Sequence, residues 1–413
     1  MATVGVFIDA GSRYENAKNN GVAHFLEHTL FKGTGKRTRV QLEKEIENIG
    51  GQLNAYTSRE QTVFYAKVFK KDVNQALDIL GDILLNSKIS EDAVNAERSV
   101  ILREMEDVDS RMQEVVFDRL HQTAYRGSSL SRTILGPKEN IESITKKDID
   151  SYIKTHYVAP RMVVAAAGDI DHAAFAAQAE KIFSAVPTKA ANGIEAVKEP
   201  AYFVGSEIRI RDDDMPAAHF AYAFETAGRT DPDHYPLMVL QMMIGSYNAS
   251  NTAAVHSSSP MMSTIAANHI AESVTPFNTV YSDTGLFGIY AVADAFDLDV
   301  LTRHIGDSLT AYAFDVNPVV LDEAKNKLKL SLFNQLEGST AVCEDLGRQM
   351  LTYKRRIHPV EVNKRIEEVT AEDVQRVVKR FFYDQDPAVA SLGPIWELPD
   401  YNALRGRTYS RVF

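Results

Sequence analysis

The sequence is poor in cysteine, in long apolar runs and in positive charge, and each shortage excludes a class of protein. Cys343 is the single cysteine in 413 residues, which excludes an intramolecular disulfide and a thiolate-rich metal site. Any transition metal must therefore be held by imidazole and carboxylate groups. Apolar runs such as Met162 to Ala167 fall far short of the roughly 20 residues that span a bilayer. The formal net charge of −11 argues against nucleic acid as the main partner and would suit a basic ligand.

A recognisable targeting signal is also missing from the start of the sequence. Met1 to Asp9 has neither the basic and apolar regions of a secretory signal nor the Arg-rich amphipathic pattern of a transit peptide. We therefore expect any targeting segment to lie outside this sequence. What is present, 45% hydrophobic and 24% charged residues, is typical of a globular protein with ample apolar material for cores. A length of 413 residues favours two domains.

Hydrophobic periodicity predicts a mixture of helices and strands. The predicted helices cover about 21–31, 40–49, 72–86 and 90–122, the last as one long helix or a broken pair. The predicted strands cover 3–9, a hairpin over 52–69, then 162–167 and 207–211. This order favours an α+β sandwich over a parallel, doubly wound sheet.

An internal repeat and a linker-like stretch predict the domain organisation. Thr145–Ile170 aligns without a gap to Thr370–Ile395, each a Thr-capped amphipathic helix followed by an apolar strand, although such a unit can recur by chance. Val186–Pro200 has the composition of a loop. We therefore expect a duplicated fold of two homologous α/β sandwich domains, each a mostly antiparallel sheet packed with helices. The predicted boundaries are 1–190 for a metal-binding peptidase domain, 191–205 for a linker and 206–413 for a homologous domain without a metal site.

The segment that most strongly indicates a metal site is His24-Phe25-Leu26-Glu27-His28. On a helix, His24 and His28 project from one face about one turn apart, so both imidazoles can reach one ion. Glu27 lies beside them, where it can hold a water molecule without being a ligand. This is the reversed spelling of the His-Glu-x-x-His motif of zinc peptidases.

A catalytic zinc site needs a third protein ligand, and Glu97 and Glu104 are the best candidates. They are seven residues apart and share a helix face, so one could bind the metal while the other orients a histidine or the water. Each feature alone has an ordinary explanation, since a histidine on an amphipathic helix is usually a surface or core residue and two acidic residues often form a solvated face. Their conjunction favours a metal site.

Three stretches carry a resemblance to a known family: Gly21–Thr34, Gly50–Glu60 and Glu97–Glu104. They resemble the site segments of the pitrilysin-type, inverted-motif zinc metallopeptidases. Within that family the chain is most similar to the beta-subunit branch of the mitochondrial processing peptidases, whose ending matches Leu392–Ile395 and Glu397–Tyr401. The resemblance covers essentially the whole chain.

Residue by residue, the resemblance implies one Zn²⁺ per chain, held by His24, His28 and Glu104. It implies Glu27 as the general base and Glu97 as the supporting acidic residue of the catalytic site. It also implies two domains that enclose a chamber, and additional residues before Ala2 that supply a first strand.

The resemblance further implies a set of substrate-binding residues. Asn54 and Ala55 match the edge strand that binds substrate main chain, and Phe31 matches the position that packs on the residue after the cleaved bond. Glu114 and Asp118 match an acidic pair that receives a presequence arginine, and their i,i+4 spacing allows both to face one guanidinium. Without the resemblance, an exposed helix face explains that pair equally well.

One further catalytic candidate lies in the second half of the chain. Tyr281 stands in a strand-and-turn segment, Phe277–Leu286, that is similar to a family segment, and it could help to stabilise the oxyanion. A strand tyrosine that only packs at a domain interface is the favoured alternative.

The implied function is removal of N-terminal presequences from proteins imported into mitochondria, in the matrix or at the matrix face of the inner membrane. The implied partners are a homologous alpha-type subunit and basic presequence peptides, which the acidic chain would attract. The alternative is a catalytically silent core subunit of respiratory complex III, in contact with its other subunits and cytochromes, and the two roles can coexist. A soluble oligopeptidase of the same family is a third possibility. The four intact metal-site residues favour the enzyme.

Overall fold

The computed structural model describes residues 1–191, 193–251 and 255–409, which form two compact units. The first unit comprises Met1–Val108, Arg132–Glu199 and Asn334–Arg356, and the second comprises Asp109–Ser131, Pro200–Phe333 and Ile357–Phe413. Each unit therefore contains a segment from the opposite half of the sequence. The two units are defined by packing and are not continuous in sequence. The predicted domain boundaries at 190 and 206 divide the chain by sequence position, and they stay a prediction.

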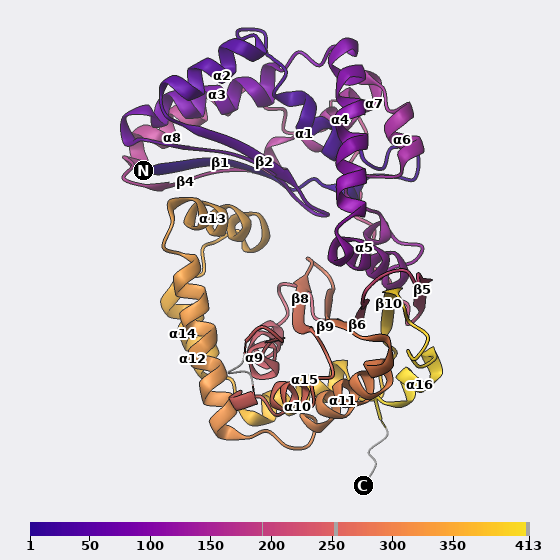
Figure 1. The fold of residues 1–413 in the computed structure, drawn as a ribbon. Coiled ribbons are helices and arrows are strands. Elements are labelled where there is room, and N and C mark those ends of the chain that lie inside the picture. Colours follow the sequence, from indigo (N-terminus) through magenta and orange to yellow (C-terminus); the bar gives the residue numbers. More distant parts are fainter. Residues whose placement is uncertain (192, 252–254, 410–413) are drawn as a thin grey trace. The chain divides into compact units, whose positions relative to one another are not determined.

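The first unit is built on a four-stranded antiparallel sheet of order β2-β3-β1-β4. Its strands are β1 (Ala2–Ile8), β2 (Gln52–Thr57), β3 (Thr62–Val68) and β4 (Met162–Gly168). Its helices are α1 (Val22–Leu30), α2 (Arg39–Asn48), α3 (Val73–Asn86), α4 (Glu91–Asp109), α6 (Lys138–Ser143), α7 (Lys146–His156), α8 (His172–Phe183) and α13 (Ser339–Tyr353). In Figure 1, α3 and α8 cover one face of this sheet and α13 covers the other. The central strand β1 is consequently buried along its whole length.

Helix α13 reaches the first sheet from late in the sequence and packs on it at close range. A Cβ atom on Gly347 would lie 2.2 Å from Cδ2 of Phe7, so only glycine fits there. Cys343 is buried in the same contact, 3.4 Å from the carbonyl oxygen of Ala165. The single cysteine is thus a packing residue of the first unit.

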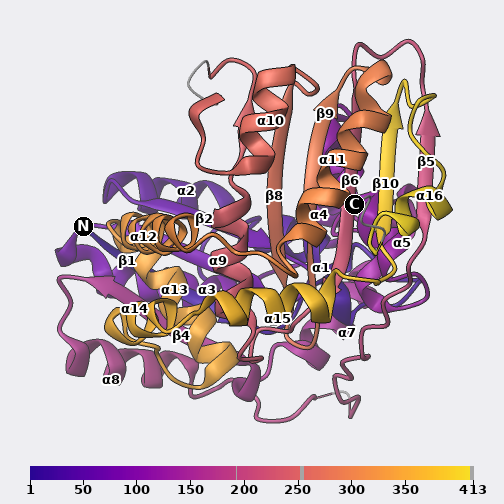
Figure 2. The same cartoon turned by 90° about the horizontal axis from the view of Figure 1, so that it is seen from below.

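The second unit is built on a six-stranded sheet of order β5-β10-β6-β9-β8-β7, which Figure 2 shows face on. All neighbours are antiparallel except β5 and β10. The strands are β5 (Glu207–Arg211), β6 (Ala218–Thr226), β7 (Tyr247–Asn248), β8 (Ser273–Val280), β9 (Gly285–Ala293) and β10 (Ala388–Gly393). The helices are α5 (Met112–Ala124), α9 (His234–Ile244), α10 (Pro260–Asn268), α11 (Leu298–Ala311), α12 (Pro318–Gln335), α14 (Pro359–Glu367), α15 (Ala371–Phe381) and α16 (Tyr401–Gly406).

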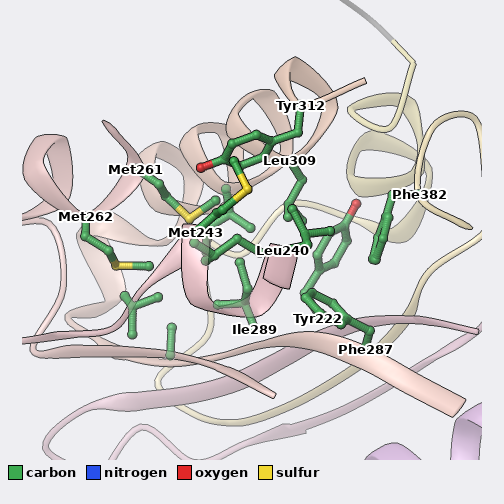
Figure 3. Close-up of a cluster of buried hydrophobic side chains, with 14 of the residues drawn as sticks. Tyr222, Leu240, Met243, Met261, Met262, Phe287, Ile289, Leu309, Tyr312 and Phe382 are labelled. Carbon is green, nitrogen blue, oxygen red and sulfur yellow. The ribbon is translucent and has the colours of Figure 1, made fainter. Parts of the chain in front are cut away.

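One face of this second sheet carries the largest apolar core of the chain. Figure 3 shows Met243 of α9, Met261 and Met262 of α10 and Leu309 of α11 in one buried cluster. Phe287 of the sheet stacks edge to face with a ring that follows α15, with 5.1 Å between the centroids. Flexible thioethers fill the irregular space between helices that cross the sheet, and aromatic rings fill the space at its end.

The internal repeat of the sequence is visible in both units. Thr145 is the N-cap residue of α7 and Thr370 is the N-cap residue of α15. Each forms a capping box with an aspartate three residues later, Asp148 or Asp373. The following strands, β4 and β10, end at Gly168 and Gly393, whose φ angles are +125° and +108°. The predicted α+β class with two helix-packed sheets is therefore confirmed.

The helix predicted over 90–122 is a broken pair, since α4 ends at Asp109 and α5 begins at Met112. Within the described residues, no helix combines the length and the apolar character needed to cross a membrane.

Candidate active site

Helix α1 carries both histidines of the motif, and a buried carboxylate fixes where it begins. Glu15 accepts hydrogen bonds from the backbone N–H groups of Gly21 and Ala23 at 2.8 and 2.7 Å, and from the amide of Asn20 at 2.7 Å. Burial raises the pKa of Glu15 to about 8, and these N–H donors oppose the rise. Gly21 has a φ of +102°, and a Cβ atom there would lie 2.5 Å from the carbonyl oxygen of Leu135. The chain can therefore enter α1 only through glycine.

Three side chains of the first unit converge on one point. His24 and His28 lie one turn apart on α1, with 4.7 Å between their ring centroids. Their Nε2 atoms lie 3.5 and 3.2 Å from the two carboxylate oxygens of Glu104, which projects from α4. One donor atom from each of the three residues lies within 4.8 Å of the others.

Glu97 lies about two turns before Glu104 on α4 and contacts the side of His28 that faces away from Glu104. Its Oε2 lies 3.2 Å from Nδ1 of His28, and its Oε1 lies 2.6 Å from Nζ of Lys32. The sequence left open which of the two acidic residues faces the imidazole pair directly. In the structure Glu104 occupies that position, whereas Glu97 holds the far nitrogen of His28.

The charges in the cluster stabilise one another. Hydrogen bonds from His24 and His28 hold the pKa of Glu104 well below its usual range, against the opposing effect of burial. Burial lowers the pKa of His28, but contacts with Glu104 and Glu97 outweigh it, so that this pKa is raised above its ordinary value. The ligand atoms are therefore preorganised as ion pairs that a bound cation would replace.

Glu27 lies on the same helix, next to His28 in sequence, and is held from the neighbouring strand. The hydroxyl of Thr57 donates a hydrogen bond to Glu27 Oε2 at 2.6 Å. Thr57 is the last residue of β2, and its backbone pairs with Thr62 of β3. One oxygen of Glu27 is thus tied to the sheet, while the other is left for a different partner.

The donor set fits a divalent metal ion. Two imidazole nitrogens and one carboxylate, with a position left open, are the protein ligands of many hydrolytic zinc sites. Metal-ligating histidines commonly donate their second ring N–H to a carboxylate, as the contact between His28 and Glu97 permits. His24 differs, because its Nδ1 is buried and has no hydrogen-bond partner among the residues that the structure describes.

Three of the predicted substrate residues also lie in the first unit. Asn54 and Ala55 are on β2, the edge strand, and only β3 pairs with it among the described strands. The other edge of β2 therefore presents backbone N–H and C=O groups for an added strand. Phe31 follows α1 directly and packs against Phe64, with 6.0 Å between the ring centroids.

The other three predicted residues belong to the second unit. Glu114 and Asp118 share a face of α5, and Glu114 is exposed and paired with Arg111 at 3.0 Å. Tyr281 is buried, and its hydroxyl donates to Nε2 of His121 at 2.7 Å. This contact is the one expected of a strand tyrosine in a packed core, so a catalytic role for Tyr281 stays a prediction.

Sequence reasoning did not single out Lys32 or Thr57, although Lys32 contacts Glu97 and Thr57 contacts Glu27. A signal existed for each of them. Lys32 is four residues after His28, so it continues the helix face of the two histidines. Thr57 is two residues after Ala55, so both point to the same side of β2.

Comparisons with known proteins agree with this geometry. The family model described as insulinase (peptidase family M16) matches residues 1–138, and the model of the peptidase M16 inactive domain matches residues 143–328. The probable mitochondrial-processing peptidase subunit beta of Arabidopsis thaliana is 52% identical over 99% of this chain and 77% of its own length. The human mitochondrial-processing peptidase subunit beta is 47% identical over 98% of this chain and 82% of its own length.

The chain belongs to peptidase family M16. The resemblance that three short stretches of sequence carried is thereby confirmed. A solved structure of complex III2 from Candida albicans with Inz-5 bound contains a chain of the same fold, with a TM-score of 0.88 and 26% identity, covering 99% of this chain and 94% of that one. The match called the inactive domain begins after the metal cluster, in agreement with the position of all three ligand candidates before residue 105.

Proposed function

We propose that this M16 peptidase is a zinc-dependent endopeptidase that removes basic N-terminal presequences from proteins imported into mitochondria. The observation that carries the proposal is the convergence of His24, His28 and Glu104 on one point, with Glu27 held beside them. The names of relatives that are about half identical to this chain support the substrate class. Those relatives are processing-peptidase beta subunits, so the active form is a heterodimer with a homologous alpha-type subunit in the mitochondrial matrix.

In this mechanism His24, His28 and Glu104 bind the ion, and Glu27 handles the protons. Held by these residues, a zinc ion would supply Lewis-acid chemistry, which polarises a peptide carbonyl and makes a water molecule more acidic. The free oxygen of Glu27 accepts the proton of the attacking water and then returns it to the nitrogen of the leaving amine. The hydroxyl of Thr57 keeps the other oxygen of Glu27 fixed during both transfers.

Two features of the chain favour a basic, extended substrate. The open edge of β2 can add a peptide strand through main-chain hydrogen bonds, with Asn54 and Ala55 along it and Phe31 for the residue after the cleaved bond. The carboxylates of Glu114 and Asp118 lie one turn apart on α5, so an arginine of the substrate can pair with both. The net charge of −11 attracts such a peptide at long range.

A second candidate role rests on the likeness to a chain of complex III. In that role the protein is a core subunit at the matrix face of the inner membrane, in contact with other complex III subunits. The intact cluster of His24, His28 and Glu104 favours retained catalysis, and the scaffold role does not require its loss.

The test uses a presequence peptide with arginine near the cleavage site and the chain assembled with its alpha-type partner. Glu27→Gln should keep one zinc per chain and abolish cleavage, whereas His28→Ala should lose both. Glu106→Gln removes an equal charge from an exposed position of α4 and should leave both unchanged. Full activity of either site variant would refute the roles given to Glu27 and His28, and absence of cleavage by the wild type would refute the enzymatic role. Copurification of the chain with cytochromes would establish the scaffold role separately.

A further inference from the structure

Lys32 lies next to the proposed metal cluster without being part of it. It follows the end of α1, and its Nζ lies 2.6 Å from Oε1 of Glu97. The side chains of Lys32 and Glu97 are 22% and 7% exposed, so the contact is largely shielded from water. An ion pair in such a place is screened far less than one at the surface.

The second oxygen of Glu97 gives this ion pair a consequence for the cluster. Glu97 Oε2 lies 3.2 Å from Nδ1 of His28, so Lys32, Glu97 and His28 form a row of three side chains joined by two contacts. The carboxylate of Glu97 can accept the Nδ1–H of His28 and so hold the ring with Nε2 turned toward Glu104. His24 has no such support, since its Nδ1 has no partner among the described residues. The orientation of His28 therefore depends on Glu97.

A charge count around the cluster points to the same residue. Three carboxylates gather here, Glu27, Glu97 and Glu104, and a divalent ion would balance two of their charges. Lys32 supplies the third positive charge at contact distance. Arg39 also attracts Glu97, but it is paired with Glu43 at 2.8 Å and is 59% exposed, so its effect is weaker.

We propose that Lys32 is a positioning residue of the metal centre, which holds Glu97 so that Glu97 can orient His28 toward the ion. The inference rests on the proposed zinc site and adds a residue to it. Partners one contact removed from a metal typically change metal affinity by about 10- to 100-fold when they are replaced. Lys32 is two contacts removed from the ion, so the lower end of that range applies.

The test measures zinc affinity directly, by competition with a chromophoric chelator, in the chain assembled with its partner. Lys32→Met keeps the length of the side chain and removes its charge, and we expect it to weaken zinc binding by about tenfold. Lys32→Arg keeps the charge and should bind zinc within about threefold of the wild type, since a guanidinium can also pair with Glu97. Lys36→Met is the matched control, because Lys36 is exposed on the same loop, and it should not change the affinity.

A double-mutant cycle separates this role from a general effect on folding. In a Glu97→Gln background, Lys32→Met should have little further effect on zinc affinity, because the residue through which Lys32 acts has already lost its charge. Equal affinity of Lys32→Met and wild type would overturn the inference, as would an equal loss in Lys32→Arg or in Lys36→Met. An undiminished effect in the Glu97→Gln background would also overturn it. If the wild type itself binds no zinc, the proposed function fails first, and the two failures are distinguishable.

Discussion

Thr57 donates a hydrogen bond from its hydroxyl to Oε2 of Glu27, with 2.6 Å between the two oxygens. Short O–H···O⁻ bonds of this kind are about twice as strong as neutral ones, so the contact fixes the rotamer of the carboxylate. Because Thr57 ends the edge strand β2, the residue proposed to move protons is anchored to the strand proposed to bind substrate. Both proposals concern elements of the first unit, α1 and β2, that pack against each other.

The first prediction concerns this contact. Thr57→Val is nearly isosteric and removes the hydroxyl, so Glu27 loses a fixed position while the zinc ligands stay intact. We expect kcat to fall by about 10- to 100-fold, with KM and zinc content little changed, because the variant keeps the carboxylate of Glu27 and so loses only part of the roughly 10²- to 10⁴-fold contribution of a general base. Thr57→Ser restores the hydroxyl and should recover most of the activity. Steady-state kinetics with metal analysis measure all three quantities.

A purely structural role for Thr57 would give a different pattern. In that case Thr57→Val would lower the melting temperature and the zinc content together, and Thr57→Ser would not recover kcat selectively. An unchanged kcat in Thr57→Val would show that the hydroxyl contributes nothing to the reaction.

The second prediction concerns the acidic pair on α5. Glu114→Ala combined with Asp118→Ala removes the two carboxylates proposed to receive an arginine, and the exposed Glu114 would exchange its surface partner Arg111 for that arginine. We expect kcat/KM for an Arg-bearing presequence peptide to fall by about 10- to 100-fold, since a hydrogen bond to a charged group contributes roughly 1.5 to 3 kcal/mol. A peptide with citrulline in place of that arginine should be cleaved at nearly the same rate by variant and wild type.

The control for this experiment removes two charges elsewhere in the same unit. Asp315→Ala with Asp322→Ala changes exposed positions outside the helix that carries the pair. If the control lowers kcat/KM for the Arg-bearing peptide as much as the α5 variant does, the effect is long-range attraction by net charge. Specific pairing of the substrate arginine with Glu114 and Asp118 is then ruled out.

The grouping of His24, His28 and Glu104 could largely be anticipated from sequence because local geometry dictates most of it. His24 and His28 share a face of α1 through the helical period, and Glu97 and Glu104 share a face of α4 for the same reason. The sequence could not tell which carboxylate meets the imidazoles, because that choice depends on how α4 packs against α1. Such packing is set by side chains along both helices, and no local periodicity records it.

The contacts that the sequence did not reveal join segments through tertiary packing. Lys32 and Glu97 are in contact although 65 positions separate them in the sequence. Thr57 on strand β2 contacts Glu27 on helix α1. Helix α13 is the largest example. It belongs to the second half of the sequence but covers the sheet of the first unit, where Gly347 lies against Phe7. Periodicity alone cannot place such a helix, because the complementary surface of the sheet determines where it docks.

The third prediction distinguishes two roles of Tyr281. Tyr281→Phe removes the hydroxyl that donates to Nε2 of His121, which leaves a buried ring nitrogen without this donor. We expect the free energy of unfolding to fall by about 1 to 3 kcal/mol, while kcat stays within a few-fold of the wild type. Denaturant titration and peptide kinetics test this together. A roughly hundredfold loss of kcat with unchanged stability would instead support an oxyanion role.

The fourth prediction concerns acid stability of the first unit through His156. This residue ends α7, is buried against Tyr152, and accepts a hydrogen bond on Nδ1 from Arg161 at 2.9 Å. Burial, aided by the positive charge of Arg161, lowers the pKa of His156 from 6.5 to about 3. The unfolded chain therefore binds one more proton at this position between those pH values. Stability from this group is fully present above pH 6.5 and is lost as the pH falls toward 3, with a slope of at most about 1.4 kcal/mol per pH unit.

Replacing His156 should flatten that part of the pH profile. We expect His156→Gln to be less stable than the wild type at neutral pH, because it packs less well against Tyr152 and Arg161. Its free energy of unfolding should nevertheless fall less steeply between pH 6.5 and about 3, so that the two curves converge in acid. His172→Gln, at an exposed position of α8, should keep the wild-type slope. Parallel curves for His156→Gln and wild type would mean that the imidazole is protonated in the folded state across this window, contrary to its contact with Arg161.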